Sequence, residues 1–330
     1  MGRWDTFLSL PPPSTPGAYS VDGAGGACLV ARSHEGFPAV LLRFHGDAHE
    51  SAPRRLANIR YAPPRSIDLM RDGRVIQQVR LAALECRTTD AQLGAYFFRV
   101  VEALILDREG VIDEAQFDAA LDAVVILFRA LQRPGVRSVQ GLWAELAVIA
   151  WSVDPRAALA AWHSDPHQLH DFAVGSFRLE VKGTLKALRE HAFLLDQLSS
   201  MSPGVTLIAS MMLAETDDGM NVADLVGVIG GRLGVGTEAA RRLEVIVADS
   251  LGQGWREAGD LRLSLEHARR SLRFYRGEDV PTVPQPVPPA VRDVRFVADL
   301  SDVVPVASPV VRALVPALLP LLPASDTVSG

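Results

Sequence analysis

The segment 171–183, DFAVGSFRLEVKG, constrains the fold more than any other part of the sequence. Its centre, Gly175-Ser176, stands between apolar residues, and glycine at the first position of a two-residue turn suits a type II′ β-hairpin. Side chains on both sides of the turn alternate between apolar and polar, as they do in strands. The sequence therefore predicts two antiparallel strands, 169–174 and 177–182.

The turn also sets the register of the two strands. Val174 faces Phe177, and counting outward places Asp171 opposite Glu180. Because side chains alternate along a strand, Asp171, Glu180 and Lys182 share one face of the hairpin. The other face is apolar and consists of Phe172, Val174, Phe177, Leu179 and Val181.

This register predicts a site for a divalent cation. Directly opposed residues have Cα atoms about 4.5–5.5 Å apart, and like charges at that position are destabilising. A bridging Mg²⁺ would remove the repulsion between Asp171 and Glu180, since proteins commonly hold Mg²⁺ with one or two carboxylates, waters and phosphate oxygens. Lys182 would then orient or activate a water, or stabilise charge on a phosphate. The alternative is an exposed hairpin face, with Lys182 and Arg178 as ion-pair partners of the acids.

A third acid lies on the helix predicted over 138–153, with Ser138 as its N-cap. Glu145 is the only charged residue between Val139 and Trp151. A carboxylate among apolar side chains is unfavourable unless something pairs with it. We therefore expect Glu145 to belong to the same site as the hairpin acids.

Lysine is rare in this chain. Of its 33 Lys and Arg residues, only Lys182 and Lys186 are lysine. A lysine ammonium is compact and can lose its proton, whereas the planar guanidinium of arginine does not. Lys182 is thus a candidate for chemistry that arginine cannot perform, and the alternative is the chance survival of two lysines.

The rest of the chain indicates an α+β protein in three regions: a β-rich part over 1–110, the part with the site over 111–215, and an extension of helices and strands over 216–330. Outside the site we expect a hairpin of 27–31 with 38–43, a strand pair within 65–86 that turns at Asp72-Gly73, helices 91–106, 114–132 and 185–199, a strand 205–213, two helices within 221–251, a strand within 261–276, and no long helix in the proline-containing tail 303–323.

Composition excludes several classes of protein. The chain has 330 residues, 48% of them hydrophobic, so it can bury a large core. Its net charge of −6 argues against a basic coat for nucleic acid. Cys28 and Cys86 can build neither a disulfide framework nor a Cys-x-x-Cys metal site. Because no signal peptide and no membrane-spanning apolar run is visible, we expect a cytoplasmic protein that makes no membrane contact.

Three of the eight histidines, His163, His167 and His170, fall within eight residues. His163 and His167 have the spacing of a zinc pair on a helix, but Pro166 lies between them. We expect a solvated loop in which a histidine could touch phosphate, and a zinc hydrolase is the alternative.

Two arginine clusters are candidates for phosphate contacts, with a solvated surface as the alternative. Tyr275 accompanies the first cluster and Tyr61 the second. The clusters are Arg262, Arg269, Arg270, Arg273 and Arg276, and then Arg54, Arg55, Arg60 and Arg65.

The order of the site residues resembles the core of the PD-(D/E)xK nuclease superfamily: Glu in a helix, then Asp, then Glu-x-Lys on a hairpin. Over roughly 136–200 the chain is also similar to an uncharacterised bacterial family of PD-(D/E)xK proteins, which tends to occur beside restriction-modification and phage-defence genes. Looser similarity extends to the N-terminal strands and to RFYRGEDVP. The matching runs are GLWAEL (141–146), HDF (170–172), EVKGT (180–184) and REHAFLLDQL (189–198).

The resemblance implies a restriction-endonuclease-like core and a DNA endonuclease that depends on Mg²⁺ or Mn²⁺. Glu145, Asp171 and Glu180 match the metal-binding acids, and Lys182 matches the catalytic lysine. Two features depart from the pattern. His170 stands where the superfamily name has proline, and the short gap between the two hairpin acids requires a tight turn. The residues expected to touch substrate are His170, Thr184, His191 and Gln197.

The resemblance also implies partners. DNA is the expected substrate, and an ATPase, helicase or methyltransferase subunit of a defence system is an expected partner. Cleavage of both DNA strands needs two sites, so a homodimer is a further expectation. The alternative is a catalytically inactive nuclease fold that binds DNA or serves as a scaffold.

Overall fold

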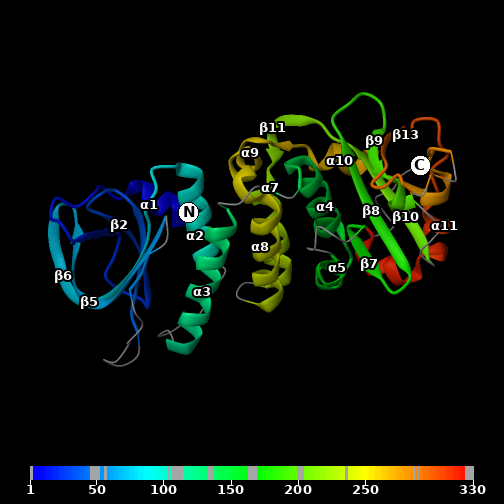
Figure 1. Ribbon diagram of the computed structural model, residues 1–330. Coiled ribbons are helices and arrows are strands. Elements are labelled where there is room, and N and C mark those ends of the chain that lie inside the picture. The colour runs from blue at the N-terminus through cyan, green and yellow to red at the C-terminus, as the bar shows by residue number, and fades with distance from the viewer. Residues whose placement is uncertain are drawn as a thin grey trace. The chain divides into compact units, whose positions relative to one another are not determined.

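The computed structural model divides the chain into two compact units (Figure 1). The first consists of Met1–Arg133 and Val235–Ala248, and the second of Pro134–Gly234 and Asp249–Gly330. These units do not coincide with the three predicted regions, because a long helix after residue 110 belongs to the first unit and the C-terminal part completes the second. The residues that the structure describes are 3–44, 53–55, 58–102, 105, 114–131, 135, 137–162, 169–198, 204–234, 237–284, 287–288 and 290–323.

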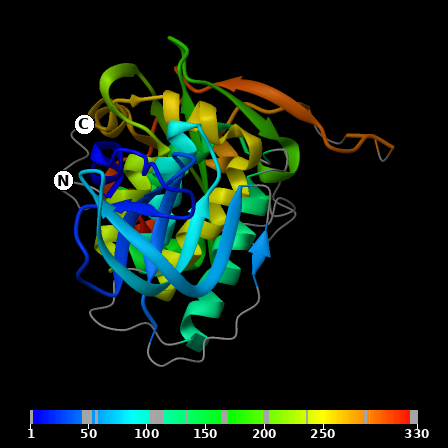
Figure 2. The ribbon, with the colours of Figure 1, turned by 90° about the vertical axis from the view of Figure 1, so that its left-hand side faces the viewer.

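The first unit contains a small closed β-barrel. Its strands follow the order β1-β2-β3-β6-β5-β4, and β1 also pairs with β5, which closes the sheet (Figure 2). Both predicted strand pairs are confirmed, since β2 pairs with β3 and β5 with β6. The β5–β6 turn has positive φ at Asp72 (51°) and Gly73 (74°), as a type I′ turn requires. The bounds are β1 (Tyr19–Val21), β2 (Cys28–Ser33), β3 (Pro38–Leu42), β4 (Arg54–Arg55), β5 (Ile59–Arg71) and β6 (Arg74–Cys86).

Side chains from alternate strand positions fill the barrel interior. In β2, for example, Leu29 and Ala31 are buried while their neighbours are half-buried. The interior cluster consists of Tyr19, Val21, Leu29, Ala31, Ala39, Leu41, Ile67, Leu69, Leu81 and Ala83.

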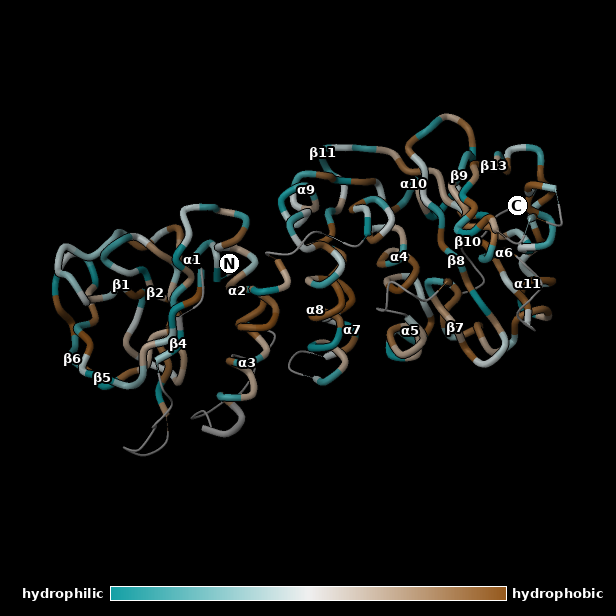
Figure 3. The backbone as a smooth tube through the Cα atoms, viewed as in Figure 1, coloured by the Kyte–Doolittle hydropathy of each residue, from teal (hydrophilic) through white to brown (hydrophobic). Residues whose placement is uncertain are grey.

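Helices α1, α2 and α3 belong to the same unit. Asp90 caps α2 by accepting hydrogen bonds from the N–H groups of the first turn. Tyr96 and Phe97 of α2 contact Phe128 of α3. Figure 3 shows that hydrophobic residues gather along part of α3. The bounds are α1 (Arg3–Ser9), α2 (Ala91–Val101) and α3 (Glu114–Ala130), and α8 (Glu238–Leu251) begins in this unit.

The second unit is built on a mixed four-stranded sheet in the order β12-β10-β8-β7. Strands β7 and β8 form the predicted hairpin in the predicted register, because Val174 pairs with Phe177 and Phe172 with Leu179. The predicted strand after the site is also confirmed as β10, which runs parallel to β8 and antiparallel to β12. The bounds are β7 (Phe172–Val174), β8 (Phe177–Thr184), β10 (Val205–Met212) and β12 (Arg273–Arg276).

Strand β8 is longer than its hairpin partner. Its pairing with β7 ends at Leu179, whereas its pairing with β10 continues to Thr184. Within the described part of the chain, no strand pairs with the other edge of β8 beyond Leu179. Residues 180–184 therefore lie in a strand that is open on one edge.

Different elements cover the two faces of this sheet. Helix α4 (Val139–Trp151), with Ser138 as the predicted N-cap, packs on one face. There Gly183 approaches Ala144 so closely that a Cβ at Gly183 would lie 3.2 Å from the Ala144 Cβ. The other face packs against the two-stranded sheet of β9 (Glu190–Leu194) and β13 (Arg295–Asp299).

The helix predicted over 185–199 is wrong. Residues Glu190–Leu194 form β9, and Leu195–Leu198 form the short helix α6. Apolar spacing fits a helical period here, but His191 and Phe193 are buried while Ala192 between them is exposed, which is strand alternation. The deciding interaction is the pairing of β9 with β13, about a hundred residues away in the sequence.

The strand predicted within 261–276 is only partly correct. Helix α10 (Leu265–Ser271) occupies its middle, and β12 follows. Ser264 starts the helix, because its hydroxyl accepts a hydrogen bond from the N–H of His267 at 3.2 Å. This capping interaction outweighs the short apolar–polar alternation before it.

The remaining elements complete the second unit. The two helices predicted within 221–251 are confirmed as α7 and α8, and the tail has no long helix. No helix in the described ranges is long and apolar enough to cross a membrane. The other bounds are α5 (Pro155–Ala161), α7 (Val222–Leu233), α9 (Trp255–Asp260), α11 (Ser308–Leu314), β11 (Glu215–Met220), and 3₁₀ helices at Gly252–Gly254, Gly277–Asp279 and Pro316–Leu321.

A substitution at Gly204, just before β10, tests how closely this strand packs beside the hairpin. Its φ is 153°, and a Cβ there would lie 1.9 Å from the carbonyl oxygen of Ser176. We predict that Gly204→Ala lowers the free energy of unfolding by more than about 1 kcal/mol, because the backbone must shift. Gly230→Ala is the matched control: this helical glycine faces open space, so the change should be neutral or stabilise by up to about 1 kcal/mol. Equal urea midpoints for the two variants would contradict this account.

Candidate active site

A pocket of about 490 Å³ lies along the open edge of β8 in the second unit. Helix α4 and the segment before it form one wall, and β9 with β13 forms the other. The lining residues are Arg137, Ser138, Gln140, Gly141, Glu145, Asp171, Glu180, Val181, Lys182, Gly183, Thr184, Leu185, Lys186, Glu190, His191, Ala192 and Val297. The pocket thus brings together all four residues that the sequence predicted as catalytic.

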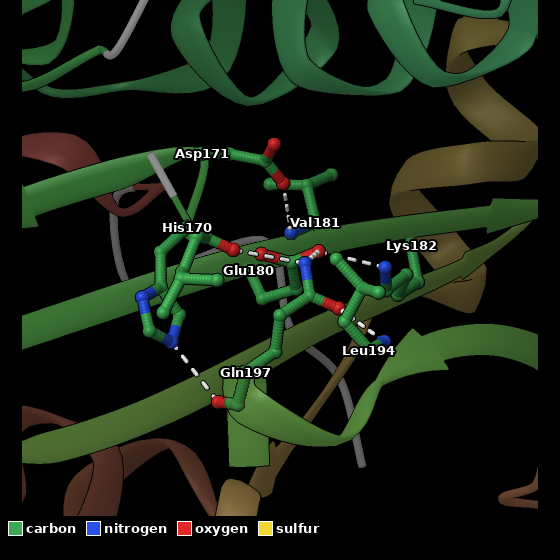
Figure 4. Close-up of polar contacts among 8 residues, drawn as sticks. His170, Asp171, Glu180, Val181, Lys182, Leu194 and Gln197 are labelled. Carbon is green, nitrogen blue, oxygen red and sulfur yellow. Dashed lines mark hydrogen bonds and ion pairs between the residues drawn. The ribbon is translucent and has the colours of Figure 1, made fainter. Parts of the chain in front are cut away.

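Asp171 reaches the pocket because it stands one residue before β7. Its Oδ2 accepts a hydrogen bond of 2.7 Å from the N–H of Val181, where a strand carbonyl would otherwise bind (Figure 4). Burial raises the pKa of Asp171, and this hydrogen bond, Lys182 and Arg137 oppose the shift. The carboxylate therefore serves as a cap for the open edge of β8.

Glu180 is the most buried acid of the hairpin, with 3% of its side chain exposed. Its Oε1 lies 2.7 Å from Lys182 Nζ and accepts a hydrogen bond of 2.7 Å from Gln197 Nε2 (Figure 4). Its Oε2 is buried and has no hydrogen-bond partner among the described residues. Burial, and then the charge of Asp171, raise the pKa of Glu180 to about 8.

Gln197 and His170, which we expected to touch substrate, instead support Glu180. Neither side chain lines the pocket. The Gln197 amide donates to Glu180 and to the carbonyl of Leu169 (2.9 Å), and its Oε1 accepts the N–H of Leu194 (3.0 Å). His170 Nε2 lies 3.0 Å from the Gln197 carbonyl oxygen, and burial lowers the pKa of this histidine. The two residues hold the Glu180 carboxylate in place.

Lys182 lies on the same face as Glu180, as the register predicted. Its Nζ is 5.0 Å from the centre of the Phe193 ring, a cation–π contact with β9. Together with the ion pair to Glu180, this contact fixes the ammonium at the pocket.

His191 and Thr184 line the pocket and are almost fully buried. His191 Nε2 lies 2.8 Å from Ser210 Oγ, which also accepts a hydrogen bond of 2.9 Å from Arg189. Burial, and then the charges of Lys182 and Arg189, lower the pKa of His191 to about 4. His191 is therefore a neutral side chain at neutral pH. Thr184 Oγ1 accepts the N–H of Lys186 at 3.2 Å.

Glu145 reaches the pocket from α4, on the opposite face of the sheet from Glu180 and Lys182. It is 5% exposed, and its Oε2 is engaged by two donors. Arg137 forms an ion pair with this oxygen, and Trp162 Nε1 donates a hydrogen bond of 2.6 Å to it. The partner that a buried carboxylate needs is thus an arginine.

The arrangement fits a divalent cation at two of the three predicted acids. Among the described residues, no group of three or more His, Cys, Asp and Glu side chains is placed to hold a metal ion. Asp171 and Glu180 remain, with the buried Glu180 Oε2 as an acceptor that needs a partner. Mg²⁺ or Mn²⁺ with two carboxylates and several waters suits this set.

The sequence did not point to Arg137, Gln140 or Trp162. Gln140 Nε2 donates to the carbonyl of Gly183 at 2.7 Å, which fixes α4 against the open edge of β8. The sequence does contain a signal for Arg137. This cation directly precedes Ser138 and lies about two helical turns before Glu145, the lone acid of the helix. No comparable local signal exists for Trp162, which comes from the end of α5.

The zinc alternative is not tested, because His163 and His167 lie outside the described residues. The arginine clusters are largely paired with acids or with the backbone, and neither Tyr61 nor Tyr275 is exposed for stacking. Arg55 has no described side chain. Among the described residues, members of the two arginine clusters form the ion pairs Arg54–Asp122, Arg60–Glu85, Arg262–Asp224, Arg270–Glu266 and Arg276–Glu278.

A family model described as "Putative PD-(D/E)XK family member, (DUF4420)" matches residues 28–301. The chain belongs to this PD-(D/E)XK family. The match spans both units and includes Glu145, Asp171, Glu180 and Lys182, so the resemblance inferred from the site residues is confirmed. No curated protein and no solved structure matches the chain. The mixed α and β architecture agrees with the predicted fold class, and a nuclease-like fold is what the family match supports.

The raised pKa of Glu180 predicts how the stability of the metal-free protein depends on pH. In the unfolded chain a glutamate titrates near ~4.3, whereas folded Glu180 keeps its proton up to about pH 8. Between these values the unfolded state binds fewer protons, so wild-type stability falls as pH rises, by at most about 1.4 kcal/mol per pH unit. Glu180→Gln should remove this contribution.

The measurement is urea unfolding of both proteins at pH 6 and pH 8. As pH rises from 6 to 8, the free energy of unfolding of Glu180→Gln should increase relative to that of the wild type. Glu190→Gln is the matched control, since Glu190 is paired at the surface with Lys186. Parallel pH curves for wild type and Glu180→Gln would refute the prediction.

Proposed function

We propose that the chain is a metal-dependent DNA endonuclease that hydrolyses phosphodiester bonds. The observation that carries the proposal is the grouping of Asp171, Glu180 and Lys182 in one open pocket, with a buried Glu180 oxygen that has no described partner. A purely structural hairpin has no need to bury two neighbouring carboxylates at an open strand edge. Membership of the PD-(D/E)XK family supports the reaction class.

The proposed roles follow from the positions of the side chains. Asp171 and Glu180 would hold Mg²⁺ or Mn²⁺, which supplies a Lewis acid and a water of lowered pKa. Gln197 keeps the Glu180 carboxylate oriented through its 2.7 Å hydrogen bond. Lys182, 2.7 Å from the same carboxylate, would place its ammonium beside the attacked phosphate and either stabilise the charge that develops there or orient the attacking water.

The biological setting is a further part of the proposal. We propose that the enzyme acts in restriction or phage defence on DNA, with an ATPase, helicase or methyltransferase as a partner. Cutting both strands would need a homodimer or two successive events. A supercoiled plasmid incubated with Mg²⁺, with and without the products of neighbouring genes, tests cleavage directly. Metal binding without cleavage under all these conditions would favour the inactive scaffold.

Metal should stabilise the folded protein. At a concentration about ten times its Kd, a ligand that binds only the native state adds about 1.4 kcal/mol to the free energy of unfolding. We therefore expect Mg²⁺ or Mn²⁺ to raise the Tm of the wild type. Asp171→Asn should abolish the rise while its amide oxygen still accepts the Val181 N–H. Asp217→Asn, at an exposed position of β11, is the matched control. An unchanged wild-type Tm would count against the metal site.

Lys182→Arg tests the lysine. The variant keeps the positive charge, but a planar guanidinium cannot occupy the position of the compact ammonium between Glu180 and Phe193. We expect a loss of cleavage of about 100-fold or more, with metal-induced stabilisation largely kept. Lys186→Arg, at an exposed lysine paired with Glu190, should lose far less. Equal cleavage by wild type and Lys182→Arg would exclude a catalytic role for Lys182.

A further inference from the structure

We infer that Arg137 is a phosphate-binding residue of the pocket, and that Glu145 positions this arginine and is not a metal ligand. The inference rests on the proposed function, because it names how the same pocket would hold the nucleic-acid backbone. It also assigns Glu145 a different role from the one that the family resemblance implies.

The backbone before α4 is held so that Arg137 enters the pocket. Gly135 lies against the end of α8, where a Cβ would come within 2.5 Å of the Leu251 carbonyl oxygen. The N–H of Arg137 then points to the Ser250 carbonyl oxygen at 3.4 Å. Ser138 follows directly and caps α4. The position of the Arg137 Cα is thus fixed from both sides.

Three mutual contacts among Arg137, Glu145 and Trp162 help to hold the side chain of Arg137. Its guanidinium lies over the Trp162 ring at 5.5 Å and forms an ion pair with Glu145. Trp162 closes the set by donating its indole N–H to the same Glu145 oxygen at 2.6 Å. The side chains of Arg137 and Glu145 are 17% and 6% exposed, so this is no mobile surface pair.

The three contacts leave the guanidinium at the pocket wall, facing the acids. Arg137 lines the same pocket as Asp171 and Glu180, and burial lowers its pKa while the charges of these two acids oppose the shift. A guanidinium has five N–H donors in a fork that matches two oxygens of a phosphate. Glu145 orients this fork from behind, on the side of α4.

The charges of the pocket fit a phosphodiester when Arg137 is counted. With all groups ionised, the carboxylates of Glu145, Asp171 and Glu180 exceed the cations Arg137 and Lys182 by one charge, and Lys186 and Glu190 cancel. A divalent cation would turn this excess into one net positive charge, equal and opposite to that of a phosphodiester. Without Arg137 the loaded pocket would be neutral and would offer no net attraction.

The test separates metal binding from DNA binding. Isothermal titration with Mn²⁺ measures the first, and fluorescence anisotropy of a labelled duplex oligonucleotide in Ca²⁺, which should not support cleavage, measures the second. The variants are Glu145→Gln, Arg137→Gln and the double variant that carries both changes. The double variant avoids leaving one buried charge without its partner, which is destabilising. Arg292→Gln, at an exposed arginine outside the pocket, is the control.

If the inference holds, Glu145→Gln and the double variant bind Mn²⁺ within about twofold of the wild type. Arg137→Gln and the double variant bind the duplex at least about 10-fold more weakly, because one hydrogen-bonded charge is lost.

Loss of Mn²⁺ binding in Glu145→Gln to the extent seen in Asp171→Asn would overturn the role of Glu145. Unchanged duplex affinity in the folded double variant would overturn the role of Arg137. A wild type that binds neither Mn²⁺ nor DNA refutes the proposed function as well, whereas a wild type that binds both with unaffected variants refutes this inference alone.

Discussion

The hydrogen bond between the Asp171 carboxylate and the Val181 N–H is the interaction on which the candidate site depends. It occurs where β7 ends and β8 continues, so a side chain takes the place of a neighbouring strand. The edge of β8 stays open, and the pocket lies along it. A carboxylate held there necessarily lies near Glu180, and much of the surrounding structure compensates for that proximity.

The proximity of the Asp171 and Glu180 carboxylates accounts for the positions of several polar side chains in the second unit. Gln197 and Lys182 both bind the same oxygen of Glu180, and Arg137 faces the acids from the other wall. Burial still raises the pKa of both hairpin acids despite these partners. The partners therefore do not fully offset the cost of ionising these buried acids, and pKa values perturbed in this way cluster at functional sites.

The local parts of the fold could be predicted from sequence because local chemistry decides them. The Gly175-Ser176 turn sets the hairpin register, and Ser138 sets the start of α4. By contrast, β9 depends on β13, and no pattern near His191 reveals a partner so far along the chain. The sequence therefore predicted that His191 belongs to the site but placed it in a helix. The supporting role of Gln197 could not be predicted for the same reason.

The site itself was predicted as far as the acids and the lysine, since alternation and spacing report which side chains share a face. They do not report what each side chain binds. Glu145 was recognised as a buried acid that needs a partner, but that partner could be a metal or a cation, and sequence alone cannot distinguish them. The answer lies in Trp162 and Arg137, which tertiary packing brings to Glu145.

The dependence of β9 on β13 has a consequence for how the protein is made. One wall of the pocket contains Ala192 and its pairing partner Val297, so the wall needs a strand that follows β9 by about a hundred residues in the sequence. During synthesis the acids and Lys182 leave the ribosome long before that strand does. A chain that lacks β13 would carry the acids and Lys182 without the wall that encloses them. The pocket is therefore completed only after β13 has been synthesised and has paired with β9.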